Sequence, residues 1–290
     1  MAGASGGSAP GRVERHRVTG RWPDLRKRVL SAALLLPAAI LGIWLGAEAW
    51  TALMAAAVAL LAWEWARLCG FSTQRLPGLA LPVLVLGAGV LGVGGAWWAA
   101  LAVLAAGFLG LWVVAEPRFG RAVPGFWLAF GVPYIGLAGL ALIHLRGDAA
   151  GLGNVLFLFL VVWASDIGAY VAGRWLGGPK LAPAISPNKT WSGAAGGLVS
   201  VMAVGLLSAY VMGSVAAPLR TVLVAAILGL LAQVGDLFES WIKRRFNVKD
   251  SSALIPGHGG LLDRLDGVLT AAPAAALLGV LLGPGEALWG

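Results

Sequence analysis

About nine apolar runs of roughly 20 residues each dominate the sequence, and they limit the folds that the chain can adopt. A helical run of this length matches the hydrocarbon thickness of a bilayer. Backbone polar groups in lipid must be satisfied internally, and continuous apolar runs fit helices better than the alternating strands of an outer-membrane barrel. We therefore expect an all-α integral membrane protein, a polytopic bundle of about nine transmembrane helices at residues 29–47, 50–68, 76–95, 97–115, 126–145, 152–173, 193–213, 217–242 and 268–285.

The basic residues predict how this bundle is oriented. Only 12% of the residues are charged, and of the 21 Lys and Arg all except Arg146 and Arg220 fall in cytosolic segments if the N-terminus is cytosolic. Such a bias is typical of the positive-inside rule. We expect a multi-pass protein of the cell inner (plasma) membrane with its polar site facing the cytosol. Retention of the basic loops in the cytosol and their attraction to anionic lipid headgroups explain the net charge of +8. No nucleic-acid partner is therefore expected.

Composition divides the chain into three regions. Residues 1–28 are Gly/Ser-rich and then basic, which predicts a disordered cytosolic tail. Residues 29–149 are mainly Ala, Leu, Val and Gly, which predicts structural, lipid-facing helices. Within them Glu64 lies three residues before Arg67, close enough on one helical face to form an ion pair. Residues 150–290 carry the clusters of polar side chains and are expected to form the transmembrane region with the cytosolic-side site.

The first polar cluster lies at the end of the sixth predicted span and in the loop after it. Asp166, Tyr170 and Arg174 are spaced four residues apart and therefore share one helical face. An unpaired carboxylate this deep in the membrane is costly, so Asp166 requires a cation, a polar cavity or a partner helix. The loop leads into the Gly-rich start of the seventh span, where backbone N–H groups favour phosphate, although a capped turn is the simpler alternative. The polar loop residues are Ser186, Asn188, Lys189 and Thr190.

Two more clusters flank the loop between the eighth and ninth predicted spans. At the end of the eighth span, Gln233, Asp236 and Ser240 share one helical face, which Lys243 or Arg244 extends. Cations at this place would also serve as a membrane anchor. In the third cluster two aspartates could simply cap a helix, but capping does not explain the cations and glycines before them. The members of the third cluster are Lys249, Asp250, His258, Gly259, Gly260, Asp263, Arg264 and Asp266.

The three clusters together indicate which chemistry the site supports. Carboxylates without a Cys or His cluster favour a hard cation, above all Mg²⁺, which usually binds through one or two carboxylates and substrate phosphates. Lys and Arg beside such an ion neutralise phosphate oxygens. The sequence has neither a Walker run nor a G-x-G-x-x-G pattern after a strand, so a soluble nucleotide-binding fold is not expected. The clusters predict phosphoryl or nucleotidyl transfer between a polyphosphate and a lipid.

Residues 240–266 read SWIKRRFNVKDSSALIPGHGGLLDRLD and resemble the signature of phosphatidate cytidylyltransferases, also called CDP-diacylglycerol synthases. That signature runs S-x-apolar-K-R, four residues, K-D, then a short spacer to H-G-G-apolar-x-D-R-apolar-D, and every fixed position is met. The segments SDIGAYVAGR and SPNKTW are also similar to this family. The resemblance covers residues 150–270 strongly and the earlier helices only by hydropathy.

The resemblance implies an Mg²⁺-dependent enzyme of phospholipid biosynthesis that transfers the cytidylyl group of CTP to phosphatidic acid, giving CDP-diacylglycerol and pyrophosphate. It also implies a centre of Mg²⁺ with K⁺ beside it, held by Asp236 and Asp263. The phosphatidate oxygen would attack the α-phosphorus of CTP directly in line. The implied catalytic residues are Asp236, Lys243, Asp263, Arg264 and Asp266. The expected substrate-binding residues are Asp166, Tyr170, Arg174, Ser186, Lys189, Thr190, Ser240, Arg244, Lys249, Asp250, His258, Gly259 and Gly260, with His258 either donating to a phosphate or capping the Gly-Gly turn.

Other functions fit parts of the pattern. The nearest is another membrane transferase, either a polyisoprenol kinase or a cytidylyltransferase for a different lipid phosphate. In a transporter, the buried charges would line a route for an ion or anion across the bilayer. The spans have no evident inverted repeat, however, and the charges gather at one face. A lipid-binding scaffold would leave Asp166, Asp236 and Asp263 unexplained. The Gly and Ala content permits close helix approach, so a homodimer is compatible with the sequence.

Overall fold

The computed structural model describes residues 37, 40–115, 125–213, 217–255, 257, 259–283 and 285–290. The predicted cytosolic tail, most of the first predicted span and His258 lie outside the described residues. The helices are α2 (Ala47–Leu68), α3 (Ala80–Val93), α4 (Trp97–Ala115), α5 (Gly125–Gly147), α6 (Gly151–Leu176), α7 (Trp191–Val211), α8 (Pro218–Arg245) and α9 (Leu262–Leu282). The strands are β1 (Lys180–Ala182) and β2 (Ser186–Thr190).

Helix length and apolarity fit a protein that spans a membrane. Within the described ranges, seven helices are long and apolar enough to cross a bilayer, whereas α3 has only 14 residues. Helix α8 has 28 residues and is about 42 Å long, which exceeds a hydrocarbon layer of about 30 Å. The protein is therefore an α-helical membrane protein. The full number of nine spans and the cytosolic N-terminus stay predictions.

The start of α9 agrees with the prediction that two aspartates open this helix. The predicted apolar span begins at residue 268, and the helix that contains it begins at Leu262. Its first turns therefore carry Asp263 and Asp266, because a helix continues beyond its apolar part wherever its first polar turns find partners. These two carboxylates therefore lie on a rigid helix, as expected.

The segment after α6 forms a hairpin instead of the irregular loop that its Gly and Pro content predicted. Strand β1 pairs antiparallel with β2. Gly177 and Gly178 have φ values of 60° and 101°, which allow the chain to turn sharply away from α6. At the end of β2, Thr190 Oγ1 accepts a hydrogen bond of 3.1 Å from Gly193 N and so caps α7. The hairpin therefore fixes where α7 begins.

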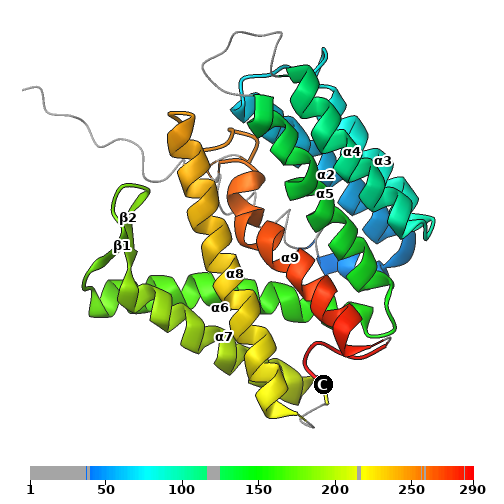
Figure 1. Ribbon diagram of the computed structural model, residues 1–290. Coiled ribbons are helices and arrows are strands. Elements are labelled where there is room, and N and C mark those ends of the chain that lie inside the picture. Colours follow the sequence, from blue (N-terminus) through cyan, green and yellow to red (C-terminus); the bar gives the residue numbers. More distant parts are fainter. Residues whose placement is uncertain are drawn as a thin grey trace, which may run out of the picture.

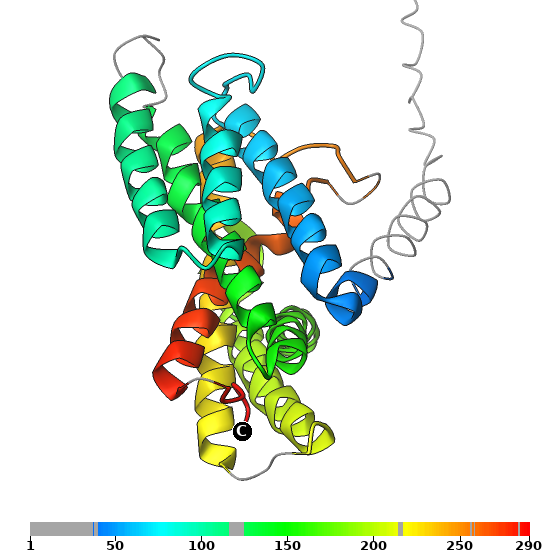
Figure 2. The ribbon, with the colours of Figure 1, turned by 90° about the vertical axis from the view of Figure 1, so that its right-hand side faces the viewer.

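The helices form two packed groups that meet along α5 and α9. In Figure 1, α8 and α9 lie side by side, α6 packs along α7, and α2 to α5 gather on the far side of α9. Figure 2 shows α2, α3 and α4 together in the upper part of the view, and α7 and the start of α8 in the lower part. One buried core consists mainly of residues of α2 to α5 and also contains a few residues of α8 and α9. A second consists mainly of residues of α6 to α9 and also contains a few residues of α2 and α5. Helix α5 contacts both α2 and α9 and so connects the groups.

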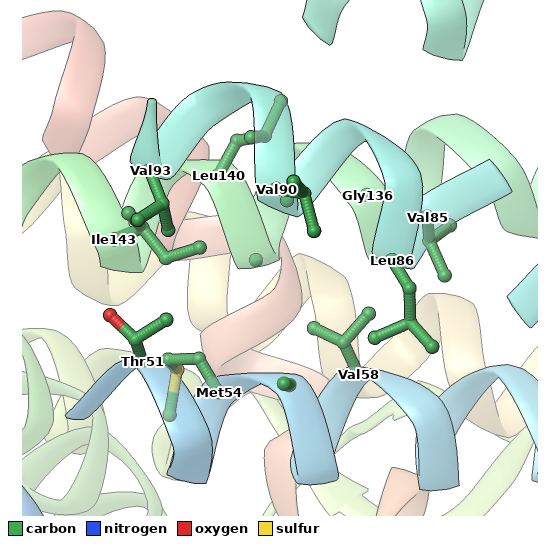
Figure 3. A pocket seen from close by; sticks show the side chains of 13 residues that line it. Thr51, Met54, Val58, Val85, Leu86, Val90, Val93, Gly136, Leu140 and Ile143 are labelled. Carbon is green, nitrogen blue, oxygen red and sulfur yellow. The ribbon is translucent and has the colours of Figure 1, made fainter. Parts of the chain in front are cut away.

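An apolar cavity of about 390 Å³ lies between α2, α3 and α5. Figure 3 shows Met54 and Val58 of α2 facing Val85 and Leu86 of α3 across it. Glycines of α3 and α5 contribute to its wall, and Thr51 provides a hydroxyl. This lining suits hydrocarbon and not phosphate, so the cavity is separate from the charged clusters that the sequence singled out.

Candidate functional site

Lys243 joins the end of α8 to the start of α9. Its Nζ lies 2.6 Å from Asp263 Oδ1 and 3.0 Å from Glu239 Oε1. Glu239 is one helical turn before Lys243 and is fully buried. The Lys243 side chain is only 15% exposed, and the Asp263 side chain is only 6% exposed. The ammonium group is therefore held between two carboxylates in a site that excludes most water.

The second oxygen of Asp263 organises the loop before α9. Asp263 Oδ2 accepts hydrogen bonds from Ser251 N at 2.9 Å, from Ser251 Oγ at 2.9 Å and from Gly260 N at 2.8 Å. With Lys243 on the other oxygen, the carboxylate has four donors. Asp263 therefore fixes the loop that carries the signature sequence, whatever further ligand it takes.

A second ion pair joins the hairpin to α8. Lys189 Nζ contacts Asp236 Oδ2, and the two side chains are 26% and 33% exposed. Lys189 lies on β2 directly before Thr190, the cap of α7, so the simpler reading of this loop as a capped turn is correct for Thr190. The hairpin places a cation against a carboxylate that solvent can still reach. Solvent access is what a substrate phosphate would need.

Carboxylates from three helices interact electrostatically at this end of the molecule. Asp166 of α6 is influenced by the charges of Asp236, Lys189 and Arg264. Asp266 of α9 is influenced by Asp236, Asp166 and Lys243. The structure therefore brings together Asp166, Asp236 and Asp266, together with the cations that the sequence placed in separate clusters.

The remaining predicted site residues are less tightly held. Tyr170 and Arg174 are exposed on α6, and Arg244 donates from Nε to Ile185 O of the hairpin at 3.5 Å. Lys249 and Asp250 are exposed, whereas Ser186 and Ser240 are half-buried. Gly259 has a φ of 84° and pairs with Ile255, which keeps the loop tight before Gly260. His258 lies outside the described residues, so both of its predicted roles stay predictions.

Three polar residues contribute to the site although the sequence analysis did not assign them to it. Ser251 binds Asp263, and Ser252 Oγ donates to Glu64 Oε1 at 2.5 Å. Glu239 holds Lys243, and the Glu–x–x–x–Lys spacing was a readable signal for this pair. The two serines follow Lys249 and Asp250 directly in the signature, which was the only signal for them.

Glu64 has other partners than the sequence predicted. Arg67, the expected partner, instead lies over the ring of Trp63, 4.9 Å from its centroid. Glu64 accepts hydrogen bonds from the loop before α9 and from the first turn of α9. The expected i, i+3 ion pair was wrong because a buried carboxylate gains more from several buried N–H and O–H donors than from one exposed guanidinium.

The residues present fit a hard divalent cation. In the part of the chain that the structure describes, no three His, Cys, Asp or Glu side chains are already gathered as a metal site. However, the candidate metal ligands at this end are carboxylate oxygens, and the buried Glu239 Oε2 has no hydrogen-bond partner among the described residues. Lys189 pairs with Asp236 and Lys243 pairs with Asp263, so each carboxylate already attracts a positive charge. Such a donor set suits Mg²⁺ rather than a soft metal.

Fold and site together define a class of protein: an α-helical membrane protein in which several helices bring carboxylates and cations to one end, as recognition of a phosphate-bearing substrate requires. The chain belongs to the cytidylyltransferase family, whose model matches residues 26–282. The match spans both helix groups, so the helices before the signature are part of the family fold.

Several bacterial proteins are similar to the chain over most of its length. A phosphatidate cytidylyltransferase of Brucella suis is 39% identical over 272 residues, which cover 89% of this chain and 94% of the relative. One of Pseudomonas aeruginosa is 36% identical over 276 residues, covering 88% and 96%. One of Haemophilus influenzae is 34% identical over 277 residues, covering 86% and 96%.

Proposed function

We propose that this chain uses the site between α6, α8 and α9 to transfer the cytidylyl group of CTP to phosphatidic acid, giving CDP-diacylglycerol and pyrophosphate. The chain is an enzyme of the cytidylyltransferase family, and its relatives are named for activity on phosphatidate. The observation that carries the proposal is the network of Lys243, Asp263, Ser251 and Gly260, because it unites the two ends of the signature in one place.

The reaction joins two polyanions, so the site must first reduce their repulsion. A phosphatidate oxygen forms a bond to the α-phosphorus of CTP while the bond from that phosphorus to the pyrophosphate oxygen breaks. Lys189, Lys243 and Arg264 are the cations proposed to hold the phosphates and the leaving pyrophosphate. A phosphomonoester is already largely ionised at neutral pH, so the reaction needs no general base.

We propose Asp236 and Asp263 as the residues that hold Mg²⁺, with K⁺ as the second cation. Bound Mg²⁺ supplies charge neutralisation between the two substrates and polarises the α-phosphate. Asp166 and Asp266 are influenced by Asp236 and add negative charge to the same region. Lys189 and Lys243, which pair with the two proposed ligands in this structure, would then be available to bind substrate phosphates.

The exposed residues of the site are assigned to substrate binding. The hairpin and the start of α7 are proposed to hold the triphosphate, since they combine Lys189 with the N–H groups of a helix start. Tyr170 and Arg174 on the exposed face of α6 are proposed to hold the lipid headgroup. The other proposed substrate contacts are Asp166, Ser186, Thr190, Ser240, Arg244, Lys249, Asp250, His258, Gly259 and Gly260.

The proposed location is the cell inner membrane, with this end of the bundle in the cytosol where CTP is available. The ends of α2 and α8 and the starts of α7 and α9 meet at the same end of the bundle, as alternating spans require. A homodimer is proposed as compatible with the lipid-facing small residues. No nucleic-acid partner is proposed.

The decisive experiment uses the purified full chain in detergent with labelled CTP and Mg²⁺. Phosphatidic acid should give a labelled CDP-lipid and pyrophosphate, and chelation of the metal should stop the reaction. Polyisoprenol and a different lipid phosphate are supplied in parallel, because product from either one alone would assign the neighbouring activity. Release of labelled pyrophosphate without lipid product, or flux across proteoliposomes without turnover, would contradict the proposal.

A further inference from the structure

Glu64 of α2 is a buried carboxylate that the reaction itself does not use. Its side chain has no exposed surface, although the residue lies in the group of helices that composition marked as structural. It accepts hydrogen bonds from Leu261 N at 2.9 Å, from Leu262 N at 2.7 Å and from Ser252 Oγ at 2.5 Å. A buried carboxylate that accepts several hydrogen bonds is held in one place by its donors, so Glu64 is a fixed acceptor.

Helix α9 depends on this acceptor because its own sequence provides no cap. The residue at its N-cap position is Leu261, which has no capping side chain. The first N–H groups of a helix need an acceptor when they are buried, and the positive end of the helix dipole favours a carboxylate. Glu64 fulfils both needs from a helix almost 200 residues away in the sequence.

The contacts of Glu64 are continuous with those of Asp263. Ser251 Oγ donates to Asp263 Oδ2 at 2.9 Å and lies 3.5 Å from Glu64 Oε2. Gly260 packs between them, since a Cβ at this position would lie 1.9 Å from Ser251 Oγ and 2.6 Å from Glu64 Oε1. A displacement of Glu64 is therefore transmitted to Ser251, to Gly260 and to the carboxylate that binds Lys243.

Helix α2 is packed firmly, so it can hold the loop before α9 in a fixed position. Trp65, the residue after Glu64, is fully buried, and its Nε1 donates to Trp127 O of α5 at 2.7 Å. Gly131 of α5 leaves room for that ring, because a Cβ there would lie 2.4 Å from Trp65 Cδ1. The acceptor at the loop is thus anchored to the core of the N-terminal helices.

We propose that Glu64 is a positioning residue for the transferase site: it caps α9 from α2 and thereby sets the place of the signature loop and of Asp263. This inference rests on the proposed function. Glu64 does not touch substrate, so its loss should lower turnover through the geometry of Asp263 and Lys243. Misplacement of a reacting group by about 1 Å costs roughly 100-fold in rate, which sets the scale of the expected effect.

The test compares Glu64→Gln with Glu48→Gln. Both residues are glutamates of α2, but Glu48 is exposed in the first turn of the helix. In Glu64→Gln an amide N–H₂ faces N–H donors, so kcat per folded molecule should fall about 10-fold or more, while KM for CTP and for phosphatidic acid change by less than about threefold. Hydrogen exchange should rise at the amides of Ser251 and Gly260 and not in the core of α2 to α5. Glu48→Gln should match the wild type.

A third variant removes one donor and keeps the carboxylate. Ser252→Ala should lower kcat in the same direction by a smaller factor, and combining it with Glu64→Gln should give less than the product of the two effects. If Glu64→Gln does not fold, Ser252→Ala alone decides. Wild-type kcat per folded molecule in the testable variants, or purely multiplicative effects, would overturn the inference. An inactive wild type would instead reject the proposed function.

Discussion

Lys243 Nζ lies 2.6 Å from Asp263 Oδ1, so one short ion pair joins the last turn of α8 to the first turn of α9. The same ammonium group lies 3.0 Å from Glu239 Oε1. Since Glu239 is fully buried, Lys243 contacts an acidic side chain that water cannot reach. The lysine is therefore part of the packing between two helices and is also aimed at the proposed reaction centre.

Lys243→Met should remove turnover and also destabilise the protein, because it leaves Glu239 buried without a counter-charge. Loss of one partner of a buried pair costs about 3–5 kcal/mol of unfolding free energy. The double variant Lys243→Met/Glu239→Gln should recover most of this stability but none of the turnover. Thermal unfolding in detergent and CDP-lipid formation measure the two effects. Recovery of turnover in the double variant would remove Lys243 from the reaction.

Asp236→Asn and Asp263→Asn should both abolish turnover, but only the second should disturb the loop. Asp236 is partly exposed and has one ion-pair partner, so its substitution should change stability by about 1 kcal/mol or less. Asp263 accepts from Ser251 and Gly260, so Asp263→Asn should also increase proteolysis of the loop before α9. Near-normal turnover in either variant would remove that residue from the proposed metal site.

Lys189→Ala should weaken use of CTP with little effect on folding. The Lys189–Asp236 pair is partly exposed and is therefore worth about 1 kcal/mol or less. If the lysine holds a phosphate, KM for CTP should rise about 10-fold, the equivalent of one charge-assisted hydrogen bond. Lys180→Ala, at the exposed start of the same hairpin, is the matched control and should leave KM unchanged. An equal effect of both substitutions would point to general loss of positive charge.

Gly260→Ala should inactivate the enzyme for steric reasons. A Cβ would lie 1.9 Å from Ser251 Oγ and 2.6 Å from Glu64 Oε1, so the loop must move. Gly110→Ala in α4 is the control, because a Cβ there meets open space and alanine is the better helix former. Turnover per folded molecule distinguishes the two. Wild-type turnover in Gly260→Ala would show that the loop adapts without loss.

The sequence predicted the main helices well because the length of an apolar run follows directly from the thickness of a bilayer. The run at residues 97–115 coincides with α4, and the eighth span continues as one helix to its three cations, as expected. It also singled out Asp236, Lys243 and Asp263, which the structure places in ion pairs, while their roles in the reaction stay predictions. These features depend on local pattern alone.

The sequence could not predict contacts between distant segments. The partner of Glu64 lies almost 200 residues away, and nothing in the local pattern of α2 distinguishes a cap for α9 from an ion pair with Arg67. The hairpin of β1 and β2 was missed because Gly and Pro mark turns without revealing which strands pair across them. Both errors concern tertiary structure.

The hydrogen bonds from Leu261 and Leu262 to Glu64 also bear on how the molecule can be divided. A fragment that begins at α6 would retain the signature and every proposed ligand, yet the first N–H groups of its last helix would lack the acceptor that Glu64 provides. Such a fragment should be inactive by itself and should regain turnover when a second polypeptide supplies α2 to α5. The two halves of the chain thus complement each other as subunits would.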